Sequence, residues 1–153
     1  MTAWFSLIIA TRPADRVQRK SKCIFSSWSQ SVGKEPRYQS VFVSLKCILG
    51  KYSGELVLVK NQADDYYLDT NFIMKNRKPM FFGAVQVKKN YVAYHLMPVY
   101  VFPELLSGIS PRLRRRMQGK SCFNFKAADQ ALFHELEQLT AAGYQRYKEA
   151  NYI

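Results

Sequence analysis

Four arginines within five residues are the densest group of chemically active side chains in the sequence. Arg112, Arg115 and Arg116 stand at positions i, i+3 and i+4 of a predicted short helix over residues 111–118, so they share one face of it. Together with Lys120 they are candidate anion-binding residues, for phosphate, nucleic acid or an acidic partner. The alternative is that they form only a solvated face. Other basic side chains that would extend such a surface are Arg114, Lys88 and Lys89.

Cys122 and His95 form a second candidate pair. Cys122 is expected in a short strand beside Lys120, with His95 on a neighbouring strand. A cysteine near a histidine and a cation can become a reactive thiolate, so a thiol enzyme that uses Cys122 is one hypothesis. The alternative is a small buried apolar residue, which is the usual state of a free cysteine. No nucleotide-binding loop, serine triad or metal motif occurs, which favours a non-catalytic protein.

Aromatic side chains are more numerous than two helices and a small sheet require, so some of them are candidates to line a ligand pocket. Tyrosine hydroxyl groups at the mouth of such a pocket would suit a small polar or planar ligand. The alternative is that these rings belong to the core and its rim. The candidate pocket residues are Tyr66, Tyr67, Phe82, Tyr91, Tyr94, His95 and Tyr100.

Acidic side chains gather at only two places that bear on metal binding. Asp64, Asp65 and Asp69 lie near one predicted strand and are the candidate metal ligands, while Glu135 and Glu137 lie on the last predicted helix. A hard ion such as iron prefers several oxygen ligands close together, and neither group forms a continuous ridge of carboxylates. The sequence therefore requires no cofactor and leaves the metal, if there is one, unidentified.

The charge of the chain is concentrated in its middle. The net charge is +12, and residues 71–126 hold eleven Lys and Arg side chains against Glu104 alone. Such asymmetry concerns partners and solubility rather than fold. Three widely spaced cysteines without a CxxC pair favour a reducing compartment, and no apolar run approaches the length of a membrane span. We therefore expect a cytoplasmic location.

The predicted domain organisation follows from the periodicity of apolar residues. Residues 1–38 carry no periodic face, so we expect an unstructured or mis-assigned N-terminal extension followed by a domain over residues 39–153. A first amphipathic helix is predicted after Ser40 as its cap and before Gly54. A longer helix is predicted after the cap Asp129. Its apolar stripe comprises Leu132, Phe133, Leu136, Leu139, Thr140, Gly143, Tyr144 and Tyr147.

Several strands are predicted between these two helices. The strongest signal is a β-hairpin formed by residues 80–88 and 91–97. Strict alternation within it would place Phe81 and Gly83 on one face and Phe82 and Ala84 on the other. Shorter strands are predicted at residues 56–60, 66–70 and 121–125.

Two short helices, PELLS and PRLRRRMQ, precede the last strand, and the second of them is expected to end at Gly119. The order of elements predicts an α+β fold. Its antiparallel sheet carries the two longer helices, N- and C-terminal, on one face.

The hairpin and the segment after it read KPMFFGAVQVKKNYVAYHLMPVYVFPELLSGISPRLRRRMQGKSCFNFK, and this string resembles a YdhG-like domain, a mostly uncharacterised bacterial family. The resemblance extends from about residue 41 to residue 153. The features that carry it are the hairpin with Tyr91, Tyr94 and His95, the helix ending in Gly119, the strand with Cys122 and Phe125, and the C-terminal helix.

The resemblance implies a compact domain related in fold to frataxin, and one branch of the family is associated with intracellular iron delivery. The leading hypothesis is therefore a non-catalytic binding or carrier protein for a small ligand or a metal such as iron. Binding of anions or nucleic acid on the arginine-rich helix is the alternative, and a thiol enzyme is the third.

Overall fold

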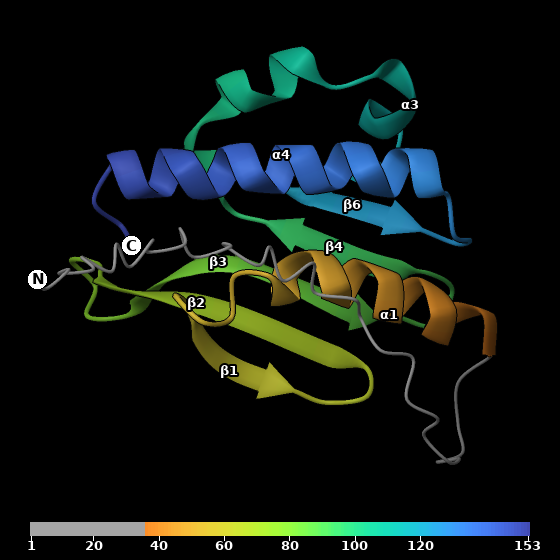
Figure 1. Cartoon of the computed structure of the whole chain (residues 1–153), viewed down its shortest axis with the longest axis horizontal. Coiled ribbons are helices and arrows are strands. Elements are labelled where there is room, and N and C mark those ends of the chain that lie inside the picture. Colours follow the sequence, from red (N-terminus) through yellow and green to blue (C-terminus); the bar gives the residue numbers. More distant parts are fainter. Residues whose placement is uncertain (1–35) are drawn as a thin grey trace, which may run out of the picture.

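The computed structural model describes residues 36–153, which form one six-stranded antiparallel sheet and its helices. The strands follow the order β1-β2-β3-β4-β6-β5 across the sheet (Figure 1). The helices are α1 (Pro36–Gly50), α2 (Pro98–Val101), η1 (Pro103–Gly108), α3 (Pro111–Arg114) and α4 (Gln130–Glu149). The strands are β1 (Val57–Asn61), β2 (Asp65–Ile73), β3 (Pro79–Val87), β4 (Val92–Leu96), β5 (Met117–Gln118) and β6 (Cys122–Phe125).

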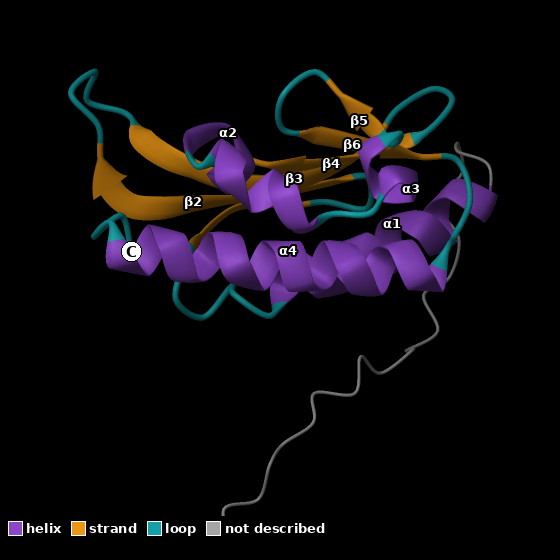
Figure 2. Cartoon of the chain, turned by 90° about the horizontal axis from the view of Figure 1, so that it is seen from above, coloured by secondary structure: helices purple, strands orange, loops and turns teal. Residues whose placement is uncertain are grey.

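The two long helices, α1 and α4, lie side by side on the same face of the sheet (Figure 2). The predicted α+β class with two helices on one face is therefore confirmed, and the sheet is open rather than closed into a barrel. The short elements α2, η1 and α3 pack along α4. None of the helices in the described part of the chain is both long and apolar enough to cross a bilayer.

Helix α4 is the element that the sequence predicted best. Asp129 caps it, because its Oδ1 accepts a hydrogen bond from the backbone N–H of Leu132 at 3.2 Å. All eight residues of the predicted stripe are buried. Gly143 allows a close approach to α2, since a Cβ at this position would lie 2.7 Å from the Cβ of Pro98.

The predicted hairpin is confirmed as β3 and β4, but its strict alternation is wrong at Phe82. In the pairing of β2 with β3, Leu68 faces Gly83 while the next residue faces Phe81, so Phe82 lies in a bulge. Phe82 therefore turns to the helices together with Gly83, and its ring packs edge-on against Tyr147 of α4. Phe81 points to the opposite face.

Both predicted ends of α1 are also wrong. Helix α1 begins at Pro36, so Ser40 lies inside it rather than at its cap, and the helix ends at Gly50 rather than at Gly54. The expected boundary between residues 38 and 39 thus falls within α1, where Tyr38 is buried and donates a hydrogen bond to the carbonyl of Asn90 at 2.9 Å. The extension over residues 1–35 lies outside the described residues.

The arginine-rich helix is shorter than predicted. Helix α3 ends at Arg114, and Met117 and Gln118 instead form β5. Gly119 is not a helix end but the first residue of the turn from β5 to β6, where its φ of +71° suits a residue without a Cβ.

Candidate anion-binding site

Helix α3 is fixed to α4 by the residue that caps it. The hydroxyl of Ser110 accepts a hydrogen bond from the N–H of Leu113 at 3.1 Å, as predicted for an N-cap. Glu135 of α4 accepts hydrogen bonds from both the backbone N–H and the hydroxyl of Ser110. Leu113 is fully buried on the other side of the turn. A short helix that would not be stable alone is thus held in one position.

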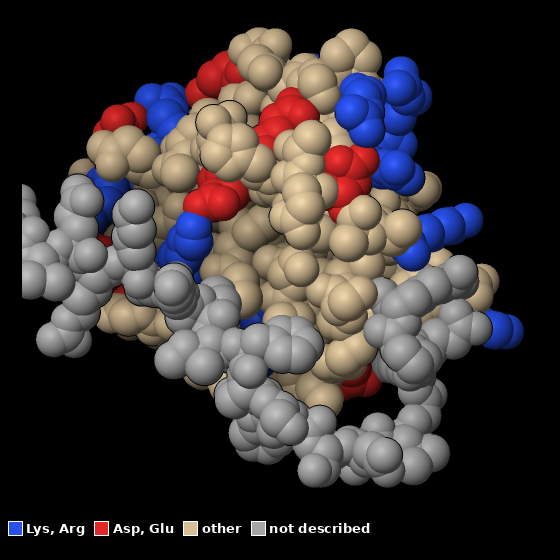
Figure 3. Space-filling model, turned by 45° about the vertical axis from the view of Figure 1, so that its right-hand side comes forward, with Lys and Arg blue, Asp and Glu red and all other residues tan. Residues whose placement is uncertain are grey.

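The three predicted arginines lie together on the outside of this anchored turn. Arg112, Arg115 and Arg116 line a hollow with a volume of about 310 Å³, and the remaining lining residue is Leu132 in the first turn of α4. Helix α4 has 20 residues and begins here, and the carboxylate of its cap Asp129 already compensates its positive N-terminal end. Lys and Arg side chains gather on the side of the molecule where α3 lies (Figure 3).

The arginines of this segment differ in what they contact. Arg112 donates to the Oδ2 of Asp129 at 3.0 Å, and Arg114 reaches away to the carbonyl of Leu106. Arg115 and Arg116 make no ion pair or side-chain hydrogen bond with any residue between 36 and 153. Two guanidinium groups of the hollow are therefore available to a bound anion.

Lys120 does not belong to the hollow. It lies in the turn between β5 and β6, where its ammonium group is 5.4 Å from the centre of the exposed Tyr100 ring. The anion-binding candidates are thus reduced to the three arginines.

The predicted aromatic pocket is divided between the two faces of the sheet. Tyr66, Phe82 and Tyr94 are buried against the helices, and the Tyr94 hydroxyl is bonded to Thr140. Tyr67 and His95 lie on the opposite face, in register with one another on either side of Ala84. Tyr91 lies half-buried beside the β3–β4 turn and Tyr100 lies exposed on α2. These rings therefore do not line one cavity.

Cys122 and His95 are indeed cross-strand neighbours on β6 and β4, with Sγ 3.8 Å from Nε2. Burial raises the pKa of the Cys122 thiol, although nearby Lys88 acts in the opposite direction. Burial, and to a lesser degree Lys88, lowers the pKa of His95. Both shifts oppose a thiolate–imidazolium pair, and the Cys122 thiol donates to the side-chain oxygen of Asn124 at 3.4 Å.

The three candidate metal ligands do not converge. Asp65 pairs with Lys60 at 2.9 Å and accepts a hydrogen bond from Gln86. Asp69 is 9% exposed and is hydrogen-bonded to Tyr67, while its Oδ1 has no partner. Asp64 lies in the turn before β2. Within residues 36–153, no three or more His, Cys, Asp or Glu side chains are grouped closely enough to hold a metal ion.

The parts that Asp129 and Leu132 have in the hollow were not predicted. Asp129 was assigned only as a helix cap, but it also holds Arg112, and Leu132 was assigned only to the core stripe. The cap was visible in the sequence because it is local, whereas the contact between α3 and the start of α4 spans 17 residues.

No protein-family model, curated protein or solved structure matches this chain.

Proposed function

We propose that this protein is a non-catalytic binding protein of the YdhG-like type and that it binds anionic ligands in the hollow formed by Arg112, Arg115 and Arg116. The observation that carries the proposal is that three arginine side chains line one hollow and that two of them have no partner among the described residues. Guanidinium groups bind phosphate and carboxylate oxygens through paired hydrogen bonds, which makes arginine the common residue of such sites.

The anchoring of α3 supports this proposal. Hydrogen bonds from Ser110 to Glu135 and the buried Leu113 fix the backbone that carries the arginines. A site on a fixed backbone loses less conformational entropy on binding than a mobile charged segment would. The ion pair of Arg112 with Asp129 is expected to limit the affinity of the hollow, because a bound anion competes with the Asp129 carboxylate for the Arg112 guanidinium group.

The test is titration of the protein with inorganic phosphate, followed by calorimetry and by thermal unfolding. Wild type is expected to bind and to be stabilised, since a ligand of the native state alone stabilises by about 2.7 kcal/mol at a hundred times its Kd. Arg115→Gln together with Arg116→Gln is expected to abolish both effects. The matched control is Lys75→Gln with Lys78→Gln, which removes two exposed charges at the opposite end of the sheet.

The Asp129→Asn substitution is expected to raise the affinity for phosphate rather than lower it. Asparagine retains the helix cap but releases Arg112, so phosphate should bind more tightly, by up to about fivefold, because an exposed ion pair contributes at most about 1 kcal/mol. Phosphate binding that is equal in wild type and in the Arg115/Arg116 variant would refute the proposed site.

A further inference from the structure

The hollow continues into a row of basic residues along one end of the sheet. Val87 pairs with Val92, and Val92 pairs with Phe125, so the residues that follow β3 and β6 emerge at the same end. The basic residues at this end are Lys88 and Lys89 after β3, Lys126 after β6, and Arg115 and Arg116 before β5, and we name this set the basic rim.

The arginines join the rim through a backbone hydrogen bond. The N–H of Asn124 donates to the carbonyl of Arg116 at 2.8 Å, which places the chain before β5 beside the end of β6. Adjacent strands lie about 4.8 Å apart, so the three spacings from Lys88 across β4 and β6 to Arg116 span about 14 Å. One phosphate group occupies only a part of such a width.

The charge of the rim is largely uncompensated. Arg115, Arg116, Lys89 and Lys126 make no ion pair with any residue of the described chain, and Lys88 donates to the neutral side chain of Gln86 at 2.8 Å. The acidic residues at this end are Asp64, Asp65 and Asp129. Asp65 pairs with Lys60 and Asp129 with Arg112, while the carbonyl of Asp64 accepts from the N–H of Val87. A row of cations at strand spacing suits a chain of phosphates better than a single anion.

The sheet face that carries neither long helix begins at this rim, and we name it the open sheet face. It has the flat side chains of Tyr67 and His95 beside the small residue Ala84. Tyr67, Ala84, His95 and Cys122 form one row across four strands, and Tyr67 stacks on Phe81 with ring centres 4.7 Å apart. Lys88 lies near enough to His95 to lower its pKa. The rings of Tyr67 and His95 are half-buried on this face. Rings on an antiparallel sheet beside basic residues are typical of surfaces on which unpaired bases stack.

We propose that the anionic partner is single-stranded nucleic acid, with its phosphates along the basic rim, one of them in the arginine hollow, and its bases on the open sheet face at Tyr67 and His95. This inference rests on the proposed function, because the hollow forms one end of the rim. It adds a partner class and a second contact surface to that function.

The experiment measures fluorescence anisotropy of a labelled thymidine strand of about ten nucleotides with the full chain at several salt concentrations. Single strands give a slope of about −0.7 in log K against log salt for each phosphate neutralised. Lys88→Gln with Lys126→Gln should therefore flatten the slope by about 1.4 and weaken binding at least tenfold, without changing the affinity for inorganic phosphate. Tyr67→Ala should weaken binding at least fivefold with little change in slope. The Lys75/Lys78 variant described above is the control.

The outcomes separate this inference from the proposed function. Oligonucleotide binding that is indifferent to the Lys88/Lys126 change, or a duplex of equal length bound as tightly as the single strand, overturns the inference. If inorganic phosphate binds through Arg115 and Arg116 while no oligonucleotide binds, the proposed function stands and the inference fails. If neither ligand binds, both fail.

Discussion

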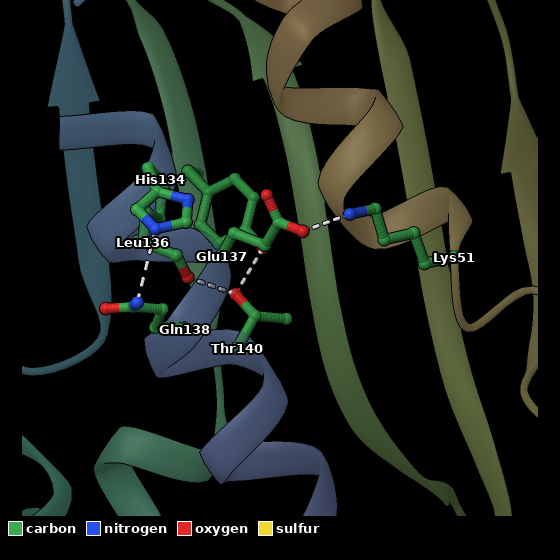
Figure 4. Close-up of polar contacts among 7 residues, drawn as sticks. Lys51, His134, Leu136, Glu137, Gln138 and Thr140 are labelled. Atoms are coloured by element: carbon green, nitrogen blue, oxygen red, sulfur yellow. Dashed lines mark hydrogen bonds and ion pairs between the residues drawn. The ribbon is translucent and has the colours of Figure 1, made fainter. Parts of the chain in front are cut away.

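The hydroxyl of Tyr94 lies 2.7 Å from Oγ1 of Thr140, which joins the middle of the sheet to the middle of α4. Thr140 also donates to the carbonyl of Leu136 at 2.7 Å (Figure 4), so its single proton is used there and Tyr94 is the donor. Both side chains are fully buried, and burial raises the pKa of Tyr94 far above its usual range. The Tyr94 hydroxyl therefore depends on one acceptor.

This hydrogen bond predicts that removing Tyr94 and removing Thr140 lower the free energy of unfolding by different amounts. Tyr94→Phe leaves Thr140 bonded to Leu136 and should lower the free energy of unfolding by about 1 kcal/mol, whereas Thr140→Val leaves a buried hydroxyl without an acceptor and should cost about 2 to 3 kcal/mol. Urea denaturation of both variants measures the difference. The double variant should be more stable than Thr140→Val alone, and a larger loss for Tyr94→Phe would contradict the assignment of donor and acceptor.

Replacing Asp69 with asparagine is predicted to stabilise the protein at neutral pH but not at acidic pH. Burial raises the pKa of this carboxyl, and its Oδ1 has no hydrogen-bond partner. The folded state thus binds the proton of this carboxyl more tightly than the unfolded state does. Below the ordinary pKa of aspartate the carboxyl is protonated in both states and does not lower the free energy of unfolding. As the pH rises through the raised pKa of the folded state, the buried charge lowers the free energy of unfolding. Asp69→Asn should raise the free energy of unfolding by about 1 kcal/mol at pH 7 and leave it unchanged at pH 3. Thermal melts at both pH values test this, and an equal gain at pH 3 would point to packing instead.

Cys122 is predicted to react slowly as a thiol in the native state. Its raised pKa keeps it protonated at neutral pH, and the thiolate is the reactive form. A small thiol reagent should label it only slowly at pH 7 and faster as the pH rises above the ordinary range of cysteine, or on unfolding. Site-resolved mass spectrometry distinguishes it from Cys23 and Cys47. Fast labelling at pH 6 would instead support the thiol-enzyme hypothesis.

Features governed by neighbours in the sequence were predicted well. The eight-residue stripe of α4 and the caps Asp129 and Ser110 need only helical spacing and one side chain that accepts from the backbone three residues later. The start of α1 at Pro36 also had a local signal, because proline is favoured at the first position of a helix, but the predicted cap was Ser40, which lies inside the helix.

Features that arise from pairing between distant segments were not predicted. The turn of Phe82 toward α4 results from the bulge opposite β2, and the sequence of β3 alone contains no sign of it. The separation of Lys120 from the arginines was also not predicted, because the β5–β6 turn places Lys120 beside Tyr100. In the hollow, the sequence predicted which arginines would converge but not that Asp129 would hold one of them.

The contact between α1 and α4 has a consequence for how the chain folds during synthesis. Helix α1 lies beside α4, and the Lys51–Glu137 and Lys148–Glu55 ion pairs join the turn after α1 to α4 (Figure 4 shows the first of them). These contacts link residues 86 and 93 positions apart, so much of the core closes late and the loop-closure entropy is large. Until α4 has been made, the apolar face of the sheet that it covers stays exposed, and a nascent chain that ends before residue 130 presents this face to other chains.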